Sequence, residues 1–105
     1  MDKIPDGITE IINNYLLSLK DDNIIISQAY LFGSYAKGTY EEHSDIDIAL
    51  VSASFCGDRV ADRTRIRKST IRNSALLEVI PFAESDFTMD NPFVKEILNH
   101  GLRIA

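Results

Sequence analysis

The chain has 105 residues, of which 45% are apolar and 26% are charged, a composition typical of one globular domain over residues 1–105. Its formal net charge of -5 argues against a nucleic-acid coat and an anionic-membrane binder, and its one cysteine, Cys56, excludes an internal disulfide and leaves a structural zinc site without support. Residues 1–10 lack the apolar core of a signal peptide and no run approaches membrane-spanning length, so we expect a cytoplasmic protein.

The first predicted element is an amphipathic helix that ends around residues 20–23. Its apolar residues recur at the spacing of one helical face: Ile8, Ile11, Ile12, Tyr15, Leu16 and Leu19. Residues 24–26 and 29–32 are apolar and predict the first strand, with an irregularity at residues 27–28. We expect the helix to pack on a sheet and assign no chemistry to it.

A Gly-Ser pair follows this strand directly. Gly33 interrupts the apolar run, and residues 34–37 can form a short helix that Gly38 ends. The start of a helix presents free backbone N–H groups and the positive end of its dipole, and a glycine lets a phosphate approach the backbone closely. The pair therefore predicts a phosphate-binding turn, although an ordinary strand–turn–helix with Ser34 as N-cap fits the same residues.

Two aspartates follow, and ten residues separate Ser34 from the first of them. Alternate residues of a strand share a face, so Asp45 and Asp47 would point one way while Ile46 and Ile48 point the other. Aspartate is depleted in strands and two on one face repel each other, a penalty that a hard cation such as Mg²⁺ removes. The pair predicts a metal site, and two solvated acids at the beginning of a strand are the alternative.

Residues 58–73 predict a basic helix with Asp58 as its N-cap. The segment holds six of the eleven basic residues of the chain: Arg59, Arg63, Arg65, Arg67, Lys68 and Arg72. One helical stripe along it consists of Val60, Thr64, Arg67 and Ile71. A basic helix in an acidic protein indicates contact with nucleic acid or a nucleotide, a docking surface for an acidic partner, or a solvated face.

Residues 75–80 predict a third strand that Pro81 ends. Glu78 lies in its middle between apolar residues, where glutamate is disfavoured. Three environments would accommodate this side chain: water at an edge of the sheet, an arginine of the basic helix, or a metal shared with Asp45 and Asp47.

After a loop over residues 86–92, a last helix is marked by Phe93, Ile97, Leu98 and Leu102, with Gly101 near its end. His100, close to that end, is expected to interact with the helix terminus. Strands that alternate with helices predict a small α/β (α+β) domain with a mixed sheet of three or four strands.

The Gly-Ser pair, the ten-residue spacing and the Asp-Ile-Asp run resemble the signature of nucleotidyltransferases of the DNA polymerase beta type. The resemblance is strongest to the minimal nucleotidyltransferase (MNT) proteins, and Lys37-Gly38 and Ser44 also fit the family's sequence around the signature. The end of the chain, from Pro81 to residue 104, is similar to many small members as well. The resemblance implies helices packed mainly on one face of the sheet and an active site at an open edge.

The resemblance also implies a chemistry. It assigns catalysis and the binding of two Mg²⁺ ions to three acids: Asp45, Asp47 and Glu78. The family usually has Asp at the third position, so glutamate is a departure there. The resemblance assigns binding of the phosphates of ATP, a nucleoside triphosphate, to Gly33, Ser34 and Lys37. One cation would lower the pKa of the attacking hydroxyl and the other would neutralise the phosphates.

The implied reaction is transfer of a nucleoside monophosphate, AMP from ATP, to a hydroxyl of a partner protein. Small members of the family are often paired with a helical HEPN protein, for which they act as antitoxin in a toxin–antitoxin system. Two alternatives stay open: a non-catalytic antitoxin or binding subunit that blocks its partner by occlusion, and a subunit of a split small-molecule nucleotidyltransferase. Nucleic acid and membranes are not expected partners, and the sequence leaves homo-oligomer formation open.

Overall fold

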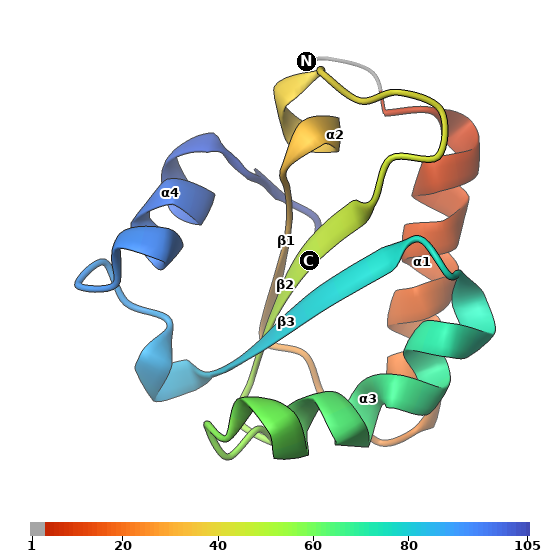
Figure 1. Ribbon diagram of the computed structural model, residues 1–105. Helices are drawn as coiled ribbons and strands as arrows, with labels where there is room; N and C mark the ends of the chain where they lie inside the picture. Colours follow the sequence, from red (N-terminus) through yellow and green to blue (C-terminus); the bar gives the residue numbers. More distant parts are fainter. Residues whose placement is uncertain (1–3) are drawn as a thin grey trace.

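The computed structural model describes residues 4–105, in which four strands form one mixed sheet with helices on both faces (Figure 1). In chain order the elements are α1 (Asp6–Asp21), β1 (Gln28–Phe32), α2 (Ser34–Lys37), β2 (Ile46–Ser52), α3 (Arg59–Asn73), β3 (Leu77–Ala83), a 3₁₀ turn (Glu84–Asp86), α4 (Pro92–His100) and β4 (Leu102–Arg103). The predicted alternation of helices and strands and the predicted mixed sheet are confirmed.

The strands lie in the order β3-β2-β1-β4, so β3 and β4 form the two edges of the sheet. β1 is antiparallel to β2 and to β4, whereas β2 and β3 are parallel. The register places Asp47 of β2 beside Phe32 of β1 on one side and beside Glu78 of β3 on the other. Asp47 therefore has a neighbouring residue on both adjacent strands.

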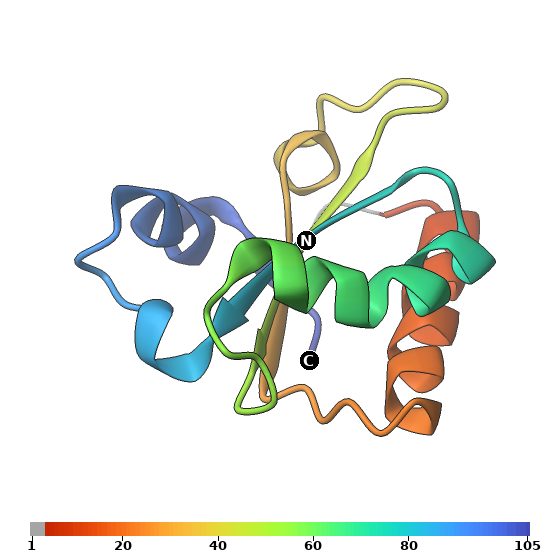
Figure 2. The same cartoon turned by 60° about the horizontal axis from the view of Figure 1, so that its bottom comes forward.

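Two layers of helices enclose the sheet. α1 and α3 pack next to each other on one side of the strands, and α4 lies on the opposite side (Figure 1 and Figure 2). The larger core cluster joins α1 and α3 to the sheet through buried residues such as Leu19, Ile48 and Ile66, and the smaller cluster joins Val51 to Val94 of α4. Because alternate residues share a face, Asp47 lies on the α4 side of the sheet with Ala49 and Val51.

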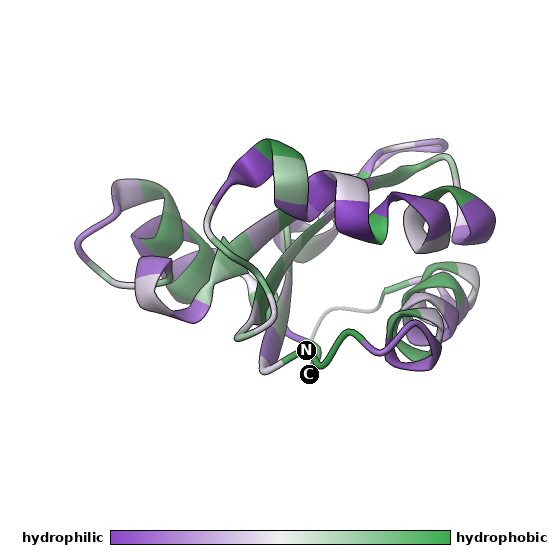
Figure 3. Cartoon of the chain, turned by 90° about the horizontal axis from the view of Figure 1, so that it is seen from below, coloured by the Kyte–Doolittle hydropathy of each residue, from purple (hydrophilic) through white to green (hydrophobic). Residues whose placement is uncertain are grey.

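α3 departs from the usual pattern of a surface helix. Hydrophilic and hydrophobic residues alternate along it without one apolar side (Figure 3). Two polar residues point inward, where Asp62 accepts hydrogen bonds from the backbone N–H groups of Cys56 and Gly57, at 3.0 and 2.9 Å, and Ser69 donates to Asp22. The N-terminal cap predicted at Asp58 is confirmed by its hydrogen bonds to the first turn of the helix.

The predicted beginning of the first strand needs correction. The prediction of a strand over residues 24–26 is wrong: the Ile24 N–H donates to the Leu19 carbonyl at 2.9 Å, so the segment follows the end of α1, and the buried Ile24 side chain fills the core from a loop. The strand begins at Gln28. Apolar content alone does not distinguish a buried loop from a strand.

The predicted end of the third strand at Pro81 is also wrong, because β3 continues to Ala83. The Leu76 carbonyl accepts from the Ile46 N–H of β2 at 2.8 Å, so by alternation the backbone groups of Pro81 face away from β2. Proline has no N–H to leave unpaired there and is tolerated at the edge of a sheet.

Leu102 belongs to β4 and not to the last helix, because α4 ends at His100 and Leu102 pairs with Leu31. Within residues 4–105, no helix combines the length and the apolar character needed to cross a membrane.

Candidate functional site

The turn between β1 and α2 has the form that the Gly-Ser pair predicts. Gly33 adopts φ +74° and ψ −149°, a combination that is essentially restricted to glycine. Its carbonyl accepts from the Lys37 N–H at 3.0 Å, and the left-handed Gly38 ends the single turn of α2. The N-cap of α2 is Gly33, and Ser34 is the first residue of the helix, so Ser34 is not the N-cap that the alternative interpretation required.

This turn lies directly against the carboxylate of Asp47. A Cβ atom added to Gly33 would overlap Oδ2 of Asp47 and would lie 3.0 Å from its Cγ and 3.3 Å from its Cβ. Any larger residue at position 33 would therefore have to displace the aspartate. The two halves of the sequence signature, fourteen positions apart, form one site because the antiparallel pairing of β1 and β2 brings them together.

Three acids share the neighbourhood of this turn. Asp45 is exposed at the beginning of β2, Asp47 is half-buried, and Glu78 is exposed on the edge strand β3. The pKa of the Asp47 carboxyl is raised, first by burial, then by repulsion from Asp45 and then by repulsion from Glu78. Asp47 therefore experiences the charge of both other acids.

The three acids are nevertheless not arranged as a finished metal site. Within residues 4–105, no group of three or more His, Cys, Asp and Glu side chains is arranged to hold a metal ion. The pKa effect and this finding agree, because repulsion between charges acts over several ångströms, whereas Mg²⁺ requires ligand oxygens at about 2.0–2.1 Å.

Glu78 does not form the predicted alternative, an ion pair with an arginine of α3. Within the described part of the chain the one ion pair joins His100 to Glu96, at 3.8 Å. Arg63 of α3 instead donates from Nε to the carbonyl of Val79, at 3.2 Å. Glu78 reaches water because β3 is an edge strand. The acids thus form a negative cluster without a cation of the protein, and their carboxylate oxygens are ligands that suit a hard divalent ion.

Two of the three predicted phosphate-binding residues, Gly33 and Lys37, share a cavity. Ser34 is half-buried and Lys37 is exposed. Gly33 and Lys37 line a cavity of about 150 Å³ with residues of α4, among them Phe93 and His100. The Phe93 ring packs edge-on against Phe32 with centroids 5.6 Å apart. Sequence reasoning missed this wall, because only the folded sheet brings α4 to the Gly-Ser turn.

Comparisons with known proteins agree with this geometry. The model of the family described as polymerase beta, nucleotidyltransferase, matches residues 10–105. A Methanocaldococcus jannaschii protein, named as a candidate protein adenylyltransferase, is 29% identical over 81 residues, which cover 75% of this chain and 79% of that protein. The protein adenylyltransferase MntA of Shewanella oneidensis is 51% identical over 41 residues, which cover 38% of this chain but only 30% of that protein.

A solved structure gives the same fold. A toxin–antitoxin crystal structure with AMP-PNP contains a chain that superposes with a TM-score of 0.61 at 23% identity, over 87% of this chain and 69% of that one. At this identity the likeness concerns the fold alone.

Proposed function

Because the chain belongs to the polymerase beta nucleotidyltransferase family and is thus an enzyme of the nucleotidyltransferase type, we propose that it transfers AMP from ATP to a hydroxyl of a partner protein. The observation that carries this proposal is the contact between the Gly33 turn and the Asp47 carboxylate. It puts the proposed phosphate site next to the proposed cation site, as a metal-assisted reaction on a triphosphate requires.

The residues of the site take separate roles in this proposal. The backbone at Gly33 and the Ser34 hydroxyl bind the leaving phosphates, and Lys37 adds a positive charge beside them. Asp45, Asp47 and Glu78 would hold the divalent ions through their carboxylate oxygens. A bound Mg²⁺ ion would neutralise the phosphates and the leaving pyrophosphate.

The transfer step forms one bond to phosphorus and breaks one. The acceptor oxygen forms a bond to the α-phosphorus of ATP, the bond from that phosphorus to the bridging oxygen breaks, and pyrophosphate leaves with the electron pair. The hydroxyl proton passes to solvent. The protein supplies orientation and charge, and no covalent intermediate with the enzyme is needed.

The partner is proposed from the relatives. The names of two relatives specify adenylyl transfer to protein, and the structural neighbour is part of a toxin–antitoxin assembly. These relationships support a role as the antitoxin of a pair whose toxin is a small helical protein of the HEPN type, with a tyrosine hydroxyl as acceptor.

The test is transfer of label to the partner. The chain is co-purified with the product of the adjacent reading frame and incubated with ATP labelled at the α-phosphate, with and without Mg²⁺. We expect label on the partner only with Mg²⁺, and mass spectrometry should identify an AMP adduct on a tyrosine. Asp47→Asn should lower transfer by at least a hundredfold, because a ligand of the ion is lost.

Asp90→Asn provides the matched control, because Asp90 is an exposed acid in the loop before α4, away from the site. It should transfer label at the wild-type rate. A stable pair that carries no adduct under any condition of nucleotide and metal would contradict the proposal and favour inhibition of the partner by occlusion.

A further inference from the structure

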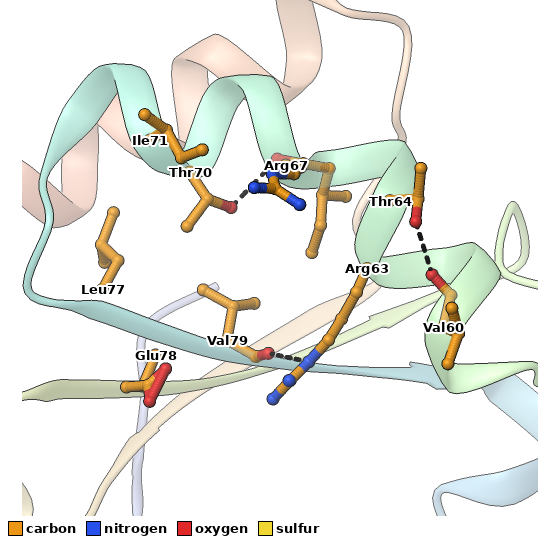
Figure 4. A pocket seen from close by; sticks show the side chains of 10 residues that line it. Val60, Arg63, Thr64, Arg67, Thr70, Ile71, Leu77, Glu78 and Val79 are labelled. Carbon is orange, nitrogen blue, oxygen red and sulfur yellow. Dashed lines mark hydrogen bonds between the residues drawn. The ribbon is translucent and has the colours of Figure 1, made fainter.

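A groove of about 430 Å³ lies between α3 and the edge strand β3 (Figure 4). Residues that line it include Val60, Arg63, Arg67 and Ile71 on the helix and Glu78 and Val79 on the strand. The stripe noted in the sequence, Val60-Thr64-Arg67-Ile71, is therefore the wall of this groove and is not buried in the core. Apart from Glu78, the residues that line the groove have no role in the nucleotide site.

The groove and the cluster of acids meet at the edge strand β3. The Arg63 side chain crosses β3 and donates from Nε to the Val79 carbonyl, and Glu78 lies on the other side of the strand from Leu77 and Val79 (Figure 4). Glu78 is the residue that the two features share, because it lines the groove and pairs in register with Asp47 of β2.

The surface of the groove combines apolar and positive groups. Val60 is 75% exposed and Ile71 is 64% exposed, and both line the same groove. Between them lies Arg67, whose side chain makes no hydrogen bond or ion pair with any other residue of the 4–105 region. In a protein of net charge -5, this is a local positive surface.

The lining favours a peptide over a nucleic acid. The groove has no aromatic side chain on which a base could stack. One fully enclosed turn of α-helix, about 10–12 Å across and 5.4 Å long, would occupy roughly 400–600 Å³, so a groove of about 430 Å³ encloses an extended segment more readily than a helix. Addition of that segment to β3 as a full strand is impeded, because Arg63 occupies the Val79 carbonyl and Pro81 has no N–H.

We propose that the groove docks an extended acidic segment of the partner protein, the segment that carries the acceptor hydroxyl. Its acidic side chains pair with Arg63 and Arg67, and its apolar side chains contact Val60 and Ile71. The segment then places its hydroxyl beside Glu78. This inference rests on the proposed function for the identity of the acceptor, whereas the binding surface is testable without any transfer.

The probe is a fluorescent random copolymer of glutamate and tyrosine, which is acidic and carries phenolic hydroxyls. Binding to the full chain is measured by anisotropy at low salt, without nucleotide. Arg67→Glu should weaken binding about fivefold to tenfold, because reversing the charge replaces attraction by repulsion. The matched control is Lys68→Glu, the same change at an exposed neighbour that does not line the groove, and it should weaken binding less than twofold.

A second pair of variants tests the apolar wall. Ile71→Ser removes a groove residue that is 64% exposed, and Leu17→Ser removes a residue of α1 that is 59% exposed. We expect weaker binding for Ile71→Ser and wild-type binding for Leu17→Ser. Thermal unfolding should show that all four variants fold, because each changed side chain is exposed.

The outcomes are distinct. Equal losses for Arg67→Glu and Lys68→Glu, or no binding by the wild-type chain, would overturn the docking proposal. Binding of a single-stranded RNA oligomer that depends on Arg67, without binding of the copolymer, would assign the groove to nucleic acid instead. Transfer of label to the natural partner is measured separately: transfer that persists in Arg67→Glu overturns the docking surface but not the nucleotidyltransferase, whereas groove-specific binding without transfer anywhere overturns the proposed function.

Discussion

Gly33→Ala is expected to destabilise the protein through two separable effects at one position. The first is backbone strain, since φ +74° with ψ −149° costs a side-chain-bearing residue about 1–3 kcal/mol. The second is displacement of Asp47, whose carboxylate occupies the place of the new Cβ and must leave its rotamer at about 0.5–1.5 kcal/mol. Together they lower the free energy of unfolding by about 1.5–4.5 kcal/mol, with about 4–8 °C of melting temperature lost per kcal/mol.

The assay is urea unfolding followed by circular dichroism, with the free energy obtained by linear extrapolation. Gly7→Ala is the control, because Gly7 lies in the first turn of α1 and a Cβ there meets nothing within 4 Å. It should stabilise the protein by up to about 1 kcal/mol. The same substitution should thus have opposite signs at the two positions.

The double variant separates strain from displacement. Asp47→Ala removes Oδ2 and Cγ but leaves the Cβ atom and the backbone of Gly33 unchanged, so Gly33→Ala should cost about 0.5–1.5 kcal/mol less in that background. A wild-type urea midpoint for Gly33→Ala would contradict both effects. An equal loss of unfolding free energy with and without the Asp47 carboxylate would contradict the displacement of Asp47.

Further predictions concern the side chains of Asp47, Tyr15 and Asp62. Asp47→Asn should raise stability at pH 7 without divalent ions: the raised pKa means that Asp47 contributes stability when protonated, which is lost as pH rises through that pKa, so the advantage of the variant in urea unfolding should disappear near pH 3.5. Tyr15→Phe should lower stability by about 0.5–1.5 kcal/mol at pH 7, because the hydrogen bond to Thr70 is lost. Burial raises the pKa of Tyr15 to about 12, so stability of the wild type should fall relative to this variant as pH rises from 10 to 12, which alkaline unfolding monitored by circular dichroism would measure. Asp62→Ala should cost about 1–3 kcal/mol in thermal unfolding, since two loop N–H groups lose their acceptor; an unchanged melting temperature would contradict this.

The features that the sequence predicted correctly depend on local physics. The spacing of apolar residues predicted α1, Asp58 predicted the beginning of α3, and Gly33 and Gly38 predicted the limits of α2. Each of these signals lies within one or two turns of the element that it marks. The family signature supplied the pairing of the Gly-Ser turn with the acids, which the pattern of each half alone left open.

The features that the sequence did not predict depend on which elements become neighbours. Pro81 lies inside a strand because β3 is an edge, and edge position is not encoded locally. The periodicity of α3 indicated a stripe but not its direction. The helix buries Asp62 against the N–H groups of the loop that precedes it, and it buries Ser69 against Asp22, which is distant in the chain. For the same reason, the three acids were predicted as ligands, while their mutual distances depend on the register of β2 and β3, and their roles stay predictions.

The order of the strands also has a consequence for how the protein folds. β1 and β2 are consecutive in the chain and pair directly, so closing the loop between them costs less entropy than forming the parallel β2–β3 pair, which spans α3, or the β1–β4 pair, which joins distant segments. We expect β1 and β2 to be largely paired in the transition state for folding, which would bring Gly33 against Asp47 before Glu78 arrives. In stopped-flow measurements, substitutions at this contact should then slow refolding, whereas substitutions in β4 should mainly accelerate unfolding.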